Sequence, residues 1–136
     1  MSSEPRRAVV VGASSGIGEA LARRLAADGY EVGLCARRRG RLVDIGNELP
    51  TKAYVAKLDV TDADALAELP DVDALVFAAS SGGRGAEAAR EVYVEGLETA
   101  IDAFADRESP PDQLVYTSST GVYGDHDGDW VDESTP

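Results

Sequence analysis

Three glycines near the N-terminus have the spacing of a phosphate-binding turn. Residues 8–11 are apolar. Three glycines with the spacing G-x-x-x-G-x-G follow this run, and a helical pattern comes after them. In such a strand–turn–helix unit the first glycine permits the turn, the second leaves room for a pyrophosphate, and the third lets helix and strand pack closely. The helix N–H groups and dipole then face an anion. The predicted cofactor contacts are Gly12, Ser14, Ser15, Gly16, Ile17 and Gly18. The alternative is a tight turn without a ligand.

A cluster of arginines follows the second apolar run, where a dinucleotide site selects its cofactor. That run ends at Ala36, near the position where an NAD-preferring site usually has an acid for the ribose 2′-hydroxyl. This chain instead has arginines at 37, 38, 39 and 41. A guanidinium binds a 2′-phosphate through paired hydrogen bonds, whereas a carboxylate repels it. Arg37 and Arg38 therefore favour NADP, with NAD as second choice. The alternative is a solvated helix start.

Hydrophobic periodicity predicts alternating strands and helices around these residues. The expected strands are 7–12, 31–36, 52–58, 73–79 and 113–118, and the expected helices are 16–28, 39–49, 62–68 and 86–106. Gly29 is expected to end the first helix and Thr61 to cap the third. The expected apolar stripes are Ile17, Leu21 and Leu25 in the first helix and Val92, Leu97, Ile101 and Phe104 in the last.

This alternation predicts an α/β fold with a Rossmann-type, doubly wound parallel sheet of five strands in the order 3-2-1-4-5. The chain is long enough for one domain over residues 1–136. Ligands of such sheets bind beyond the carboxyl ends of the strands, where the order reverses. The Gly12 turn, Asp59, residues 78–80 and residues 118–119 all fall at that edge.

Composition restricts the possible partners and the compartment. The chain has 25 acidic and 13 basic residues, a formal net charge of −12 and one cysteine. Such a charge needs salt screening, which indicates a salt-loving cytoplasm or, alternatively, an ordinary acidic protein. Nucleic acid and anionic membranes are excluded as partners on charge, and no apolar run is long enough to span a membrane. Cys35 is predicted to be a buried hydrophobe rather than a nucleophile.

Three motifs, the glycine loop among them, make the chain resemble the short-chain dehydrogenase/reductase superfamily. The glycine loop looks like the cofactor loop of that superfamily, Leu58-Asp59-Val60-Thr61 like its motif after strand three, and Phe77-Ala78-Ala79-Ser80 like its motif after strand four. The resemblance implies that Asp59 and the Val60 backbone lie at the adenine. It implies that Ala78, Ala79 and Ser80 lie beside the nicotinamide ribose.

The two halves of the chain resemble different branches of that superfamily. Residues 1–62 look like the one-domain reductases, whereas residues 73–136 look like the extended nucleotide-sugar epimerases and dehydratases. The second half has the extended-branch run 116–125, and the resemblance makes Ser119 the catalytic serine, with Ser118 beside the cofactor and Tyr123 and Gly124 shaping the substrate loop. The mixture indicates either a natural variant or a fusion near residues 69–72.

One departure from the superfamily concerns its acid/base. Its proton donor is a tyrosine four residues before a lysine, which lowers a tyrosine pKa that is otherwise about 10. None of the five tyrosines here has lysine at that spacing. We therefore expect a truncated chain that binds NADP(H) but turns over poorly. Its full-length relatives would transfer hydride to or from a carbonyl or sugar carbon. The alternatives are a non-catalytic sensor or interaction module, and an engineered fragment.

The C-terminal region supplies two last expectations. The acidic run 125–136 lacks the glycine and glutamate positions of a calcium loop, and His126 is the only histidine, so no metal site is predicted. The strand at 113–118 would have an unpaired edge, which invites pairing with another chain. We therefore expect a homo-oligomer formed through strand 113–118 or helix 86–106.

Overall fold

The computed structural model describes residues 5–14, 16–79, 90–117 and 134. Five parallel strands form one sheet in the order β3-β2-β1-β4-β5, as the sequence predicts. The strands are β1 Arg7–Val11, β2 Glu31–Ala36, β3 Ala53–Lys57, β4 Ala74–Phe77 and β5 Gln113–Tyr116. Val11, the last residue of β1, is in register with Cys35 of β2 and Phe77 of β4, so these strands end at a common edge.

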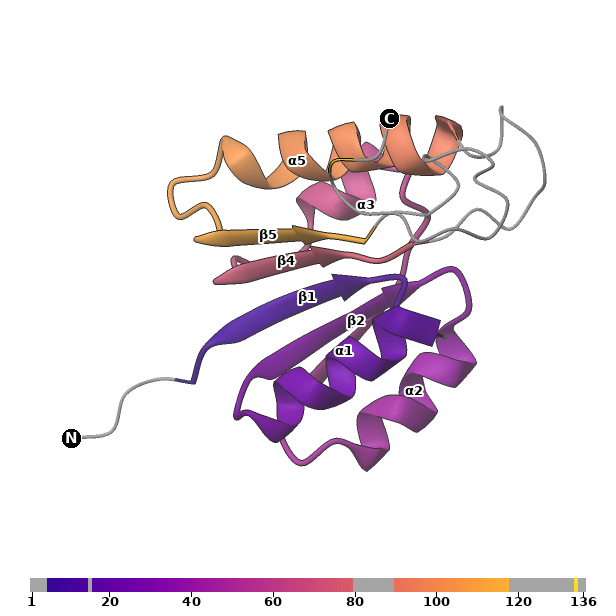
Figure 1. The fold of residues 1–136 in the computed structure, drawn as a ribbon, viewed down its shortest axis with the longest axis vertical. Coiled ribbons are helices and arrows are strands. Elements are labelled where there is room, and N and C mark those ends of the chain that lie inside the picture. Colours follow the sequence, from indigo (N-terminus) through magenta and orange to yellow (C-terminus); the bar gives the residue numbers. More distant parts are fainter. Residues whose placement is uncertain (1–4, 15, 80–89, 118–133, 135–136) are drawn as a thin grey trace.

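Helices cover both faces of the sheet (Figure 1). α1 (Gly16–Ala27) and α2 (Arg39–Glu48) lie on one face, and α3 (Ala63–Ala67), a π-helical segment η1 (Glu91–Gly96) and α5 (Leu97–Ala105) lie on the other. The expected elements are therefore present, with ends that differ by one or two residues where both ends are described. Residues 86–89 of the predicted last helix and residue 118 of the predicted last strand lie outside the described residues.

The first helix packs on the sheet through small residues. Gly18, Ala22 and Ala26 are buried, whereas Leu21 and Leu25 are only half-buried. Ile17 is 61% exposed, so its predicted burial with Leu21 and Leu25 is wrong. Because these buried side chains are small, α1 packs close to the sheet. Each residue that faces the sheet is one position after a residue of the predicted apolar stripe. α1 ends as predicted at Gly29, which has φ of +97° and follows the Schellman pattern.

The π-helical turn changes which residues of the last helix face the core. Ala100 and Phe104 are buried, whereas Ile101, predicted to be in the stripe, is 37% exposed. A π turn bonds residue i to i+5 and so contains one residue more than an α turn. The inward positions after η1 are therefore shifted by one residue relative to a regular helix, which the periodicity argument had assumed.

The third helix is short and begins one residue later than expected. Its N-cap is Asp62, whose side chain accepts a hydrogen bond from the Ala65 N–H, and not Thr61 as predicted. The Thr61 hydroxyl instead donates to Asp59, which removes it from the capping position. Within the described residues, no helix is long and apolar enough to cross a membrane.

Candidate cofactor-binding site

The glycine turn holds β1 against the neighbouring strands at the edge where the strand order reverses. Gly12 has φ of +89°, and the Gly12 and Ala13 N–H groups both donate to the Cys35 carbonyl, at 2.8 and 3.1 Å. A Cβ atom at Gly12 would lie 2.6 Å from backbone atoms of Ala78 and Ala79. A side chain is therefore excluded at Gly12 both by its φ and by the backbone that follows β4.

The other two glycines place the first turn of α1 beside this loop. A Cβ atom at Gly18 would lie 1.9 Å from the Gly12 carbonyl oxygen, so the helix touches the loop backbone directly. Gly16 has φ of +60°, and a Cβ atom there would meet nothing within 4 Å. Among the described residues, the first turn of α1 thus has open space beside Gly16, and the Ile17 side chain next to it is exposed. This geometry fits a pyrophosphate bound by the first-turn N–H groups.

The predicted cofactor-selecting arginines are exposed at the carboxyl end of β2. Arg37, Arg38 and Arg39 form no ion pair with another described residue. Arg41, by contrast, pairs with Glu19 at 2.8 Å and so belongs to the contacts between α1 and α2. Ion pairs also engage Arg6, Arg7, Arg23, Arg24 and Arg107. Arg37, Arg38 and Arg39 are therefore available to an anionic ligand at the carboxyl end of β2.

Asp59 follows β3 at the same edge and is held by its own turn. Its Oδ1 accepts hydrogen bonds from the Thr61 backbone N–H at 2.9 Å and the Thr61 hydroxyl at 2.7 Å. These two bonds, the backbone one foremost, and the nearby Arg37 guanidinium lower the pKa of the Asp59 carboxyl below its ordinary value. Asp59 is therefore a fixed anion at neutral pH, within electrostatic reach of Arg37.

Val60, next in this turn, is positioned by a glycine that the sequence analysis did not single out. A Cβ atom at Gly96 would lie 2.7 Å from the Val60 Cγ2 atom. Gly96 is the last residue of η1, so this contact fixes the distance between the π-helical segment and the Asp59–Thr61 turn. A glycine inside an otherwise helical run was the available signal, because such a glycine often has a packing reason.

Backbone hydrogen bonds at the carboxyl ends join β4 to β1 and β3 to β2. The Ala78 N–H donates to the Val11 carbonyl and the Leu58 N–H donates to the Ala36 carbonyl, both at 2.8 Å. Half-buried Ala78 and Ala79 border the Gly12 loop, as predicted for the residues after β4. The structure thus brings the Gly12 loop, Ala78 and Ala79 into contact, with Arg37 and Asp59 at the ends of the next two strands.

Several predicted site residues lie outside the described residues. They are Ser15, Ser80, Ser118, Ser119, Tyr123, Gly124 and the acidic run 125–133. Cys35 is fully buried, and burial raises the pKa of its thiol to about 12, which confirms its prediction as a core residue. Across residues 5–14, 16–79 and 90–117, no three His, Cys, Asp or Glu side chains are grouped as metal ligands.

Comparison with known proteins identifies a family and several relatives. A model of the NAD dependent epimerase/dehydratase family matches residues 8–136. An uncharacterized oxidoreductase of Mycobacterium tuberculosis is 36% identical over 146 residues, covering 88% of this chain and 57% of that protein. The chain thus spans little more than half the length of this relative.

Two solved structures share the fold. An alcohol dehydrogenase from Thermococcus sibiricus, solved in complex with 5-hydroxy-NADP, has a TM-score of 0.63 and 33% identity, covering 76% of this chain and 53% of that one. A short-chain dehydrogenase from Streptomyces avermitilis has a TM-score of 0.75 and 31% identity, covering 89% of this chain and 52% of that one.

Proposed function

The chain belongs to the NAD-dependent epimerase/dehydratase family, and we propose that it binds NADP(H) at the carboxyl edge of its sheet. One observation carries the proposal: Gly12 packs on the backbone of Ala78 and Ala79, while the first turn of α1 faces open space at Gly16. The first-turn N–H groups of such a helix suit a pyrophosphate, and this one begins at the point where the strand order reverses.

Each part of the edge has a proposed role in holding the cofactor. The pyrophosphate would bind the Gly12–Gly18 loop, which includes Ser14, Ser15 and Ile17. Asp59 and the Val60 backbone would contact the adenine. Ala78, Ala79, Ser80 and Ser118 would border the nicotinamide ribose, where the cofactor supplies or accepts a hydride.

The preference for NADP over NAD rests on the arginines after β2. Arg37 and Arg38 are exposed and form no ion pair with another described residue, in a chain with a formal net charge of −12. A 2′-phosphate could form paired, charge-assisted hydrogen bonds with these guanidinium groups. The Thermococcus dehydrogenase, solved with a derivative of NADP, agrees with this preference.

Calorimetric titration with NADPH and NADH tests the proposal. We expect NADPH to bind more tightly, and Arg37→Ala to weaken NADPH about tenfold while leaving NADH nearly unchanged, the usual scale for one charge-assisted contact. Arg24→Ala is the matched control, because Arg24 is exposed and pairs with Asp28 at the far end of α1. Absence of binding by both nucleotides would overturn the proposal, as would equal weakening of both by Arg37→Ala.

For the whole protein we propose hydride transfer to or from a carbonyl or sugar carbon, with Ser119 hydrogen-bonded to the reacting oxygen. None of the five tyrosines in the 136 residues has a lysine four residues later, so we propose little turnover for these residues alone. An NADPH oxidation assay with simple carbonyl substrates tests this. Robust turnover that Ser119→Ala abolishes would contradict the claim of low activity and support the role of Ser119.

A second candidate is a module that senses NADP(H) without reacting. Such a module would bind NADPH as tightly as an enzyme, yet show no hydride transfer with any carbonyl tested. Addition of NADPH would then change its stability or its association with another chain. An NADPH effect on neither property would leave the sensing role without support.

We further propose self-association through β5. Among the described residues, β5 pairs on one side only, with β4, while Leu114, Val115 and Tyr116 are 47%, 43% and 38% exposed. An apolar strand with an unpaired edge is a template for another strand. Val94 and Ile101 expose a smaller apolar surface on the helical segment 91–105. Light scattering over a wide concentration range tests this, and a monomer throughout would refute it.

We also propose a salt-rich cytoplasm as the working environment. The support is the net charge of −12 and the single, buried cysteine. Because salt screens self-repulsion, the free energy of unfolding should rise with KCl concentration. Stability that is unchanged or lower in molar KCl would contradict the proposal.

A further inference from the structure

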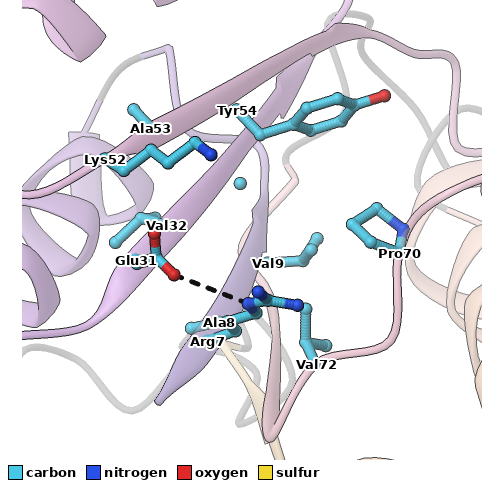
Figure 2. A pocket seen from close by; sticks show the side chains of 11 residues that line it. Arg7, Ala8, Val9, Glu31, Val32, Lys52, Ala53, Tyr54, Pro70 and Val72 are labelled. Carbon is cyan, nitrogen blue, oxygen red and sulfur yellow. Dashed lines mark ion pairs between the residues drawn. The ribbon is translucent and has the colours of Figure 1, made fainter. Parts of the chain in front are cut away.

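A pocket of about 240 Å³ lies at the amino ends of the strands, opposite the glycine-loop edge. Figure 2 shows its lining: Lys52 and Tyr54 come from the start of β3, and Pro70 and Val72 precede β4. Val9 lies between these groups, and the ion pair of Arg7 and Glu31 closes the lower side of the view. No residue of the proposed cofactor site lines it.

The pocket exists because α3 is too short to cover this end of the sheet. α3 contains five residues, and the chain then turns through Pro70 into β4. Alternation along the strands places Val9 and Tyr54 on the same face of the sheet as α3 and α5. Tyr54 is 51% exposed there. An aromatic ring in this position provides apolar surface for a ligand.

Gly33 lines the pocket from the interior of β2 and lets Val9 of β1 pack close to the β2 backbone. A Cβ atom at Gly33 would lie 3.0 Å from the Val9 Cγ2 atom and 3.7 Å from the Ala8 carbonyl oxygen. Glycine in a strand interior often marks such a close approach. The Val9 side chain therefore gives this part of the pocket an apolar floor.

The charges around the pocket indicate an anionic ligand. Arg7 Nε lies 3.5 Å from Glu31 Oε1, so these two charges largely offset each other. Lys52 forms no ion pair with any residue that the structure describes. Lys52 is one of only two lysines in the chain, and it leaves the lining with a local excess of positive charge.

We propose that this pocket binds a small aromatic carboxylate, with the carboxylate at Lys52 and the ring against Val9, Tyr54 and Val72. The volume is below the ~300–1,000 Å³ typical of drug-sized ligands, so the ligand is one or two rings in size. A carboxylate satisfies the Lys52 ammonium, and a flat ring covers the apolar surface of the lining side chains.

The pocket is separate from the proposed cofactor site. Lys52 immediately precedes β3 and Lys57 ends it, and five residues of strand span about 16 Å. A ligand at Lys52 therefore does not touch Asp59 or the Gly12 loop. Its binding neither needs NADP(H) nor depends on the cofactor proposal.

Titration of the ¹⁵N-labelled chain with 2-naphthoate, followed by amide chemical shifts, tests the proposal. The neutral isostere 2-naphthamide is the matched probe. We expect saturable shifts at Gly33 and Tyr54 but not at Gly12, and weaker binding of the amide by about fivefold, which is near the upper range for a partly exposed ion pair. Saturating NADPH should leave the naphthoate affinity unchanged.

Two lysine variants identify the group that recognises the carboxylate. Lys52→Gln should make naphthoate bind as weakly as naphthamide, whereas Lys57→Gln, the control on the same strand, should keep the fivefold difference. Tyr54→Ala should weaken both probes equally, because it removes apolar contact and not charge. Each variant's stability is checked by urea unfolding, so that loss of fold is not read as loss of binding.

Four results would overturn the proposal. They are equal binding of naphthoate and naphthamide, a difference that survives Lys52→Gln, shifts centred on Gly12 or Arg37, and ligand-free shifts at Gly33 that grow with protein concentration. The last result would show that a second copy of the chain covers the pocket.

Discussion

The two ends of the parallel strands are built from different atoms. At the carboxyl ends the surface is largely backbone: Gly12 donates to the Cys35 carbonyl, and Ala78 donates to the Val11 carbonyl. At the amino ends the pocket is lined by long side chains, among them Lys52 and Tyr54. The shape of the carboxyl end is thus set by the backbone of the fold. The shape of the amino-end pocket is set by side chains that could be exchanged with little effect on the fold.

This difference predicts how each end responds to substitution. A site built from backbone is visible in the sequence as a spacing of glycines, because only glycine permits the turn and the close contacts. Substitutions of these glycines should destabilise the protein. A side-chain pocket leaves no spacing pattern, and changes there should alter binding more than stability. Substitutions at the two ends test that contrast.

Gly12→Ala should have the largest effect. It places a Cβ atom 2.6 Å from the Ala78–Ala79 backbone, at φ of +89°. Strained φ costs about 1–3 kcal/mol and overpacking against rigid backbone about as much again, so we expect a loss of at least ~3 kcal/mol of unfolding free energy in urea.

Two control variants bracket this result. Gly40→Ala meets nothing within 4 Å and lies in α2, so it should stabilise by about 1 kcal/mol. Tyr54→Ala, at the other end of the strands, should cost no more than about 1 kcal/mol, because the ring is half exposed. A loss at Tyr54 equal to that at Gly12 would contradict the contrast between the two ends.

Sequence reasoning predicted the carboxyl end better than the amino end. The glycine turn and the burial of Cys35 follow from patterns within a short window, because buried parallel strands are continuous apolar runs. Strand order follows from the alternation of strands and helices and from right-handed crossovers. The errors at Ile17, Thr61 and Ile101 have tertiary causes: close packing of small residues, a hydroxyl taken by Asp59, and an extra residue in η1. No sequence pattern predicted the pocket, because the pocket depends on the surface that α3 leaves uncovered.

Gly96→Ala should have the next largest effect, and it is the prediction that the sequence alone did not make. Its Cβ atom would lie 2.7 Å from Val60 Cγ2, so either η1 or the Asp59–Thr61 turn must move. We expect a loss of about 1–3 kcal/mol, the usual cost of overpacking. Because the turn is the proposed adenine site, affinity for 2′,5′-ADP should also fall.

The double variant Gly96→Ala/Val60→Ala separates this contact from a general effect of helix alanine. Removing the Val60 methyl groups makes room for the new Cβ atom, so stability and affinity for 2′,5′-ADP should both recover in part. Val60→Ala alone serves as the reference for the double-mutant cycle. Strictly additive losses would show that Gly96 acts independently of Val60.

A third prediction concerns the core directly beneath the carboxyl end. Burial raises the pKa of the Cys35 thiol to about 12, above its ordinary value near 9. Between these values the unfolded chain releases the thiol proton and the folded chain keeps it, so stability falls as pH rises. The contribution is about 1.4 kcal/mol per pH unit.

Cys35→Ala isolates this contribution. The variant loses packing at every pH, but it has no thiol to ionise, so wild type and variant should converge in stability from pH 8 to 10.5. Urea unfolding at a series of pH values measures the convergence. A constant difference between the two proteins would mean that the folded thiol ionises as readily as the unfolded one.

The smallest effect is expected at Asp59, which is mostly exposed. Hydrogen bonds from Thr61 hold the pKa of the Asp59 carboxyl below its unfolded value, so this stabilisation is present above the unfolded pKa and is lost as pH falls through the folded pKa. Thr61→Val removes the hydroxyl bond of 2.7 Å and keeps the backbone bond. Allowing for solvent screening, we expect a cost of about 0.5 kcal/mol at pH 7.

Thr99→Val is the matched control for the Asp59 prediction, because the Thr99 hydroxyl donates to the uncharged Glu95 carbonyl. Its cost should not depend on pH, whereas the Thr61→Val cost should shrink as Asp59 becomes protonated. A ¹³C NMR titration of the Asp59 carboxyl should show a higher pKa in Thr61→Val than in wild type. An unchanged pKa would mean that the Thr61 hydroxyl does not lower the Asp59 pKa and that the hydrogen bond from the backbone N–H is the one that does. The charge at Asp59 would then depend on the backbone, like the rest of the carboxyl edge.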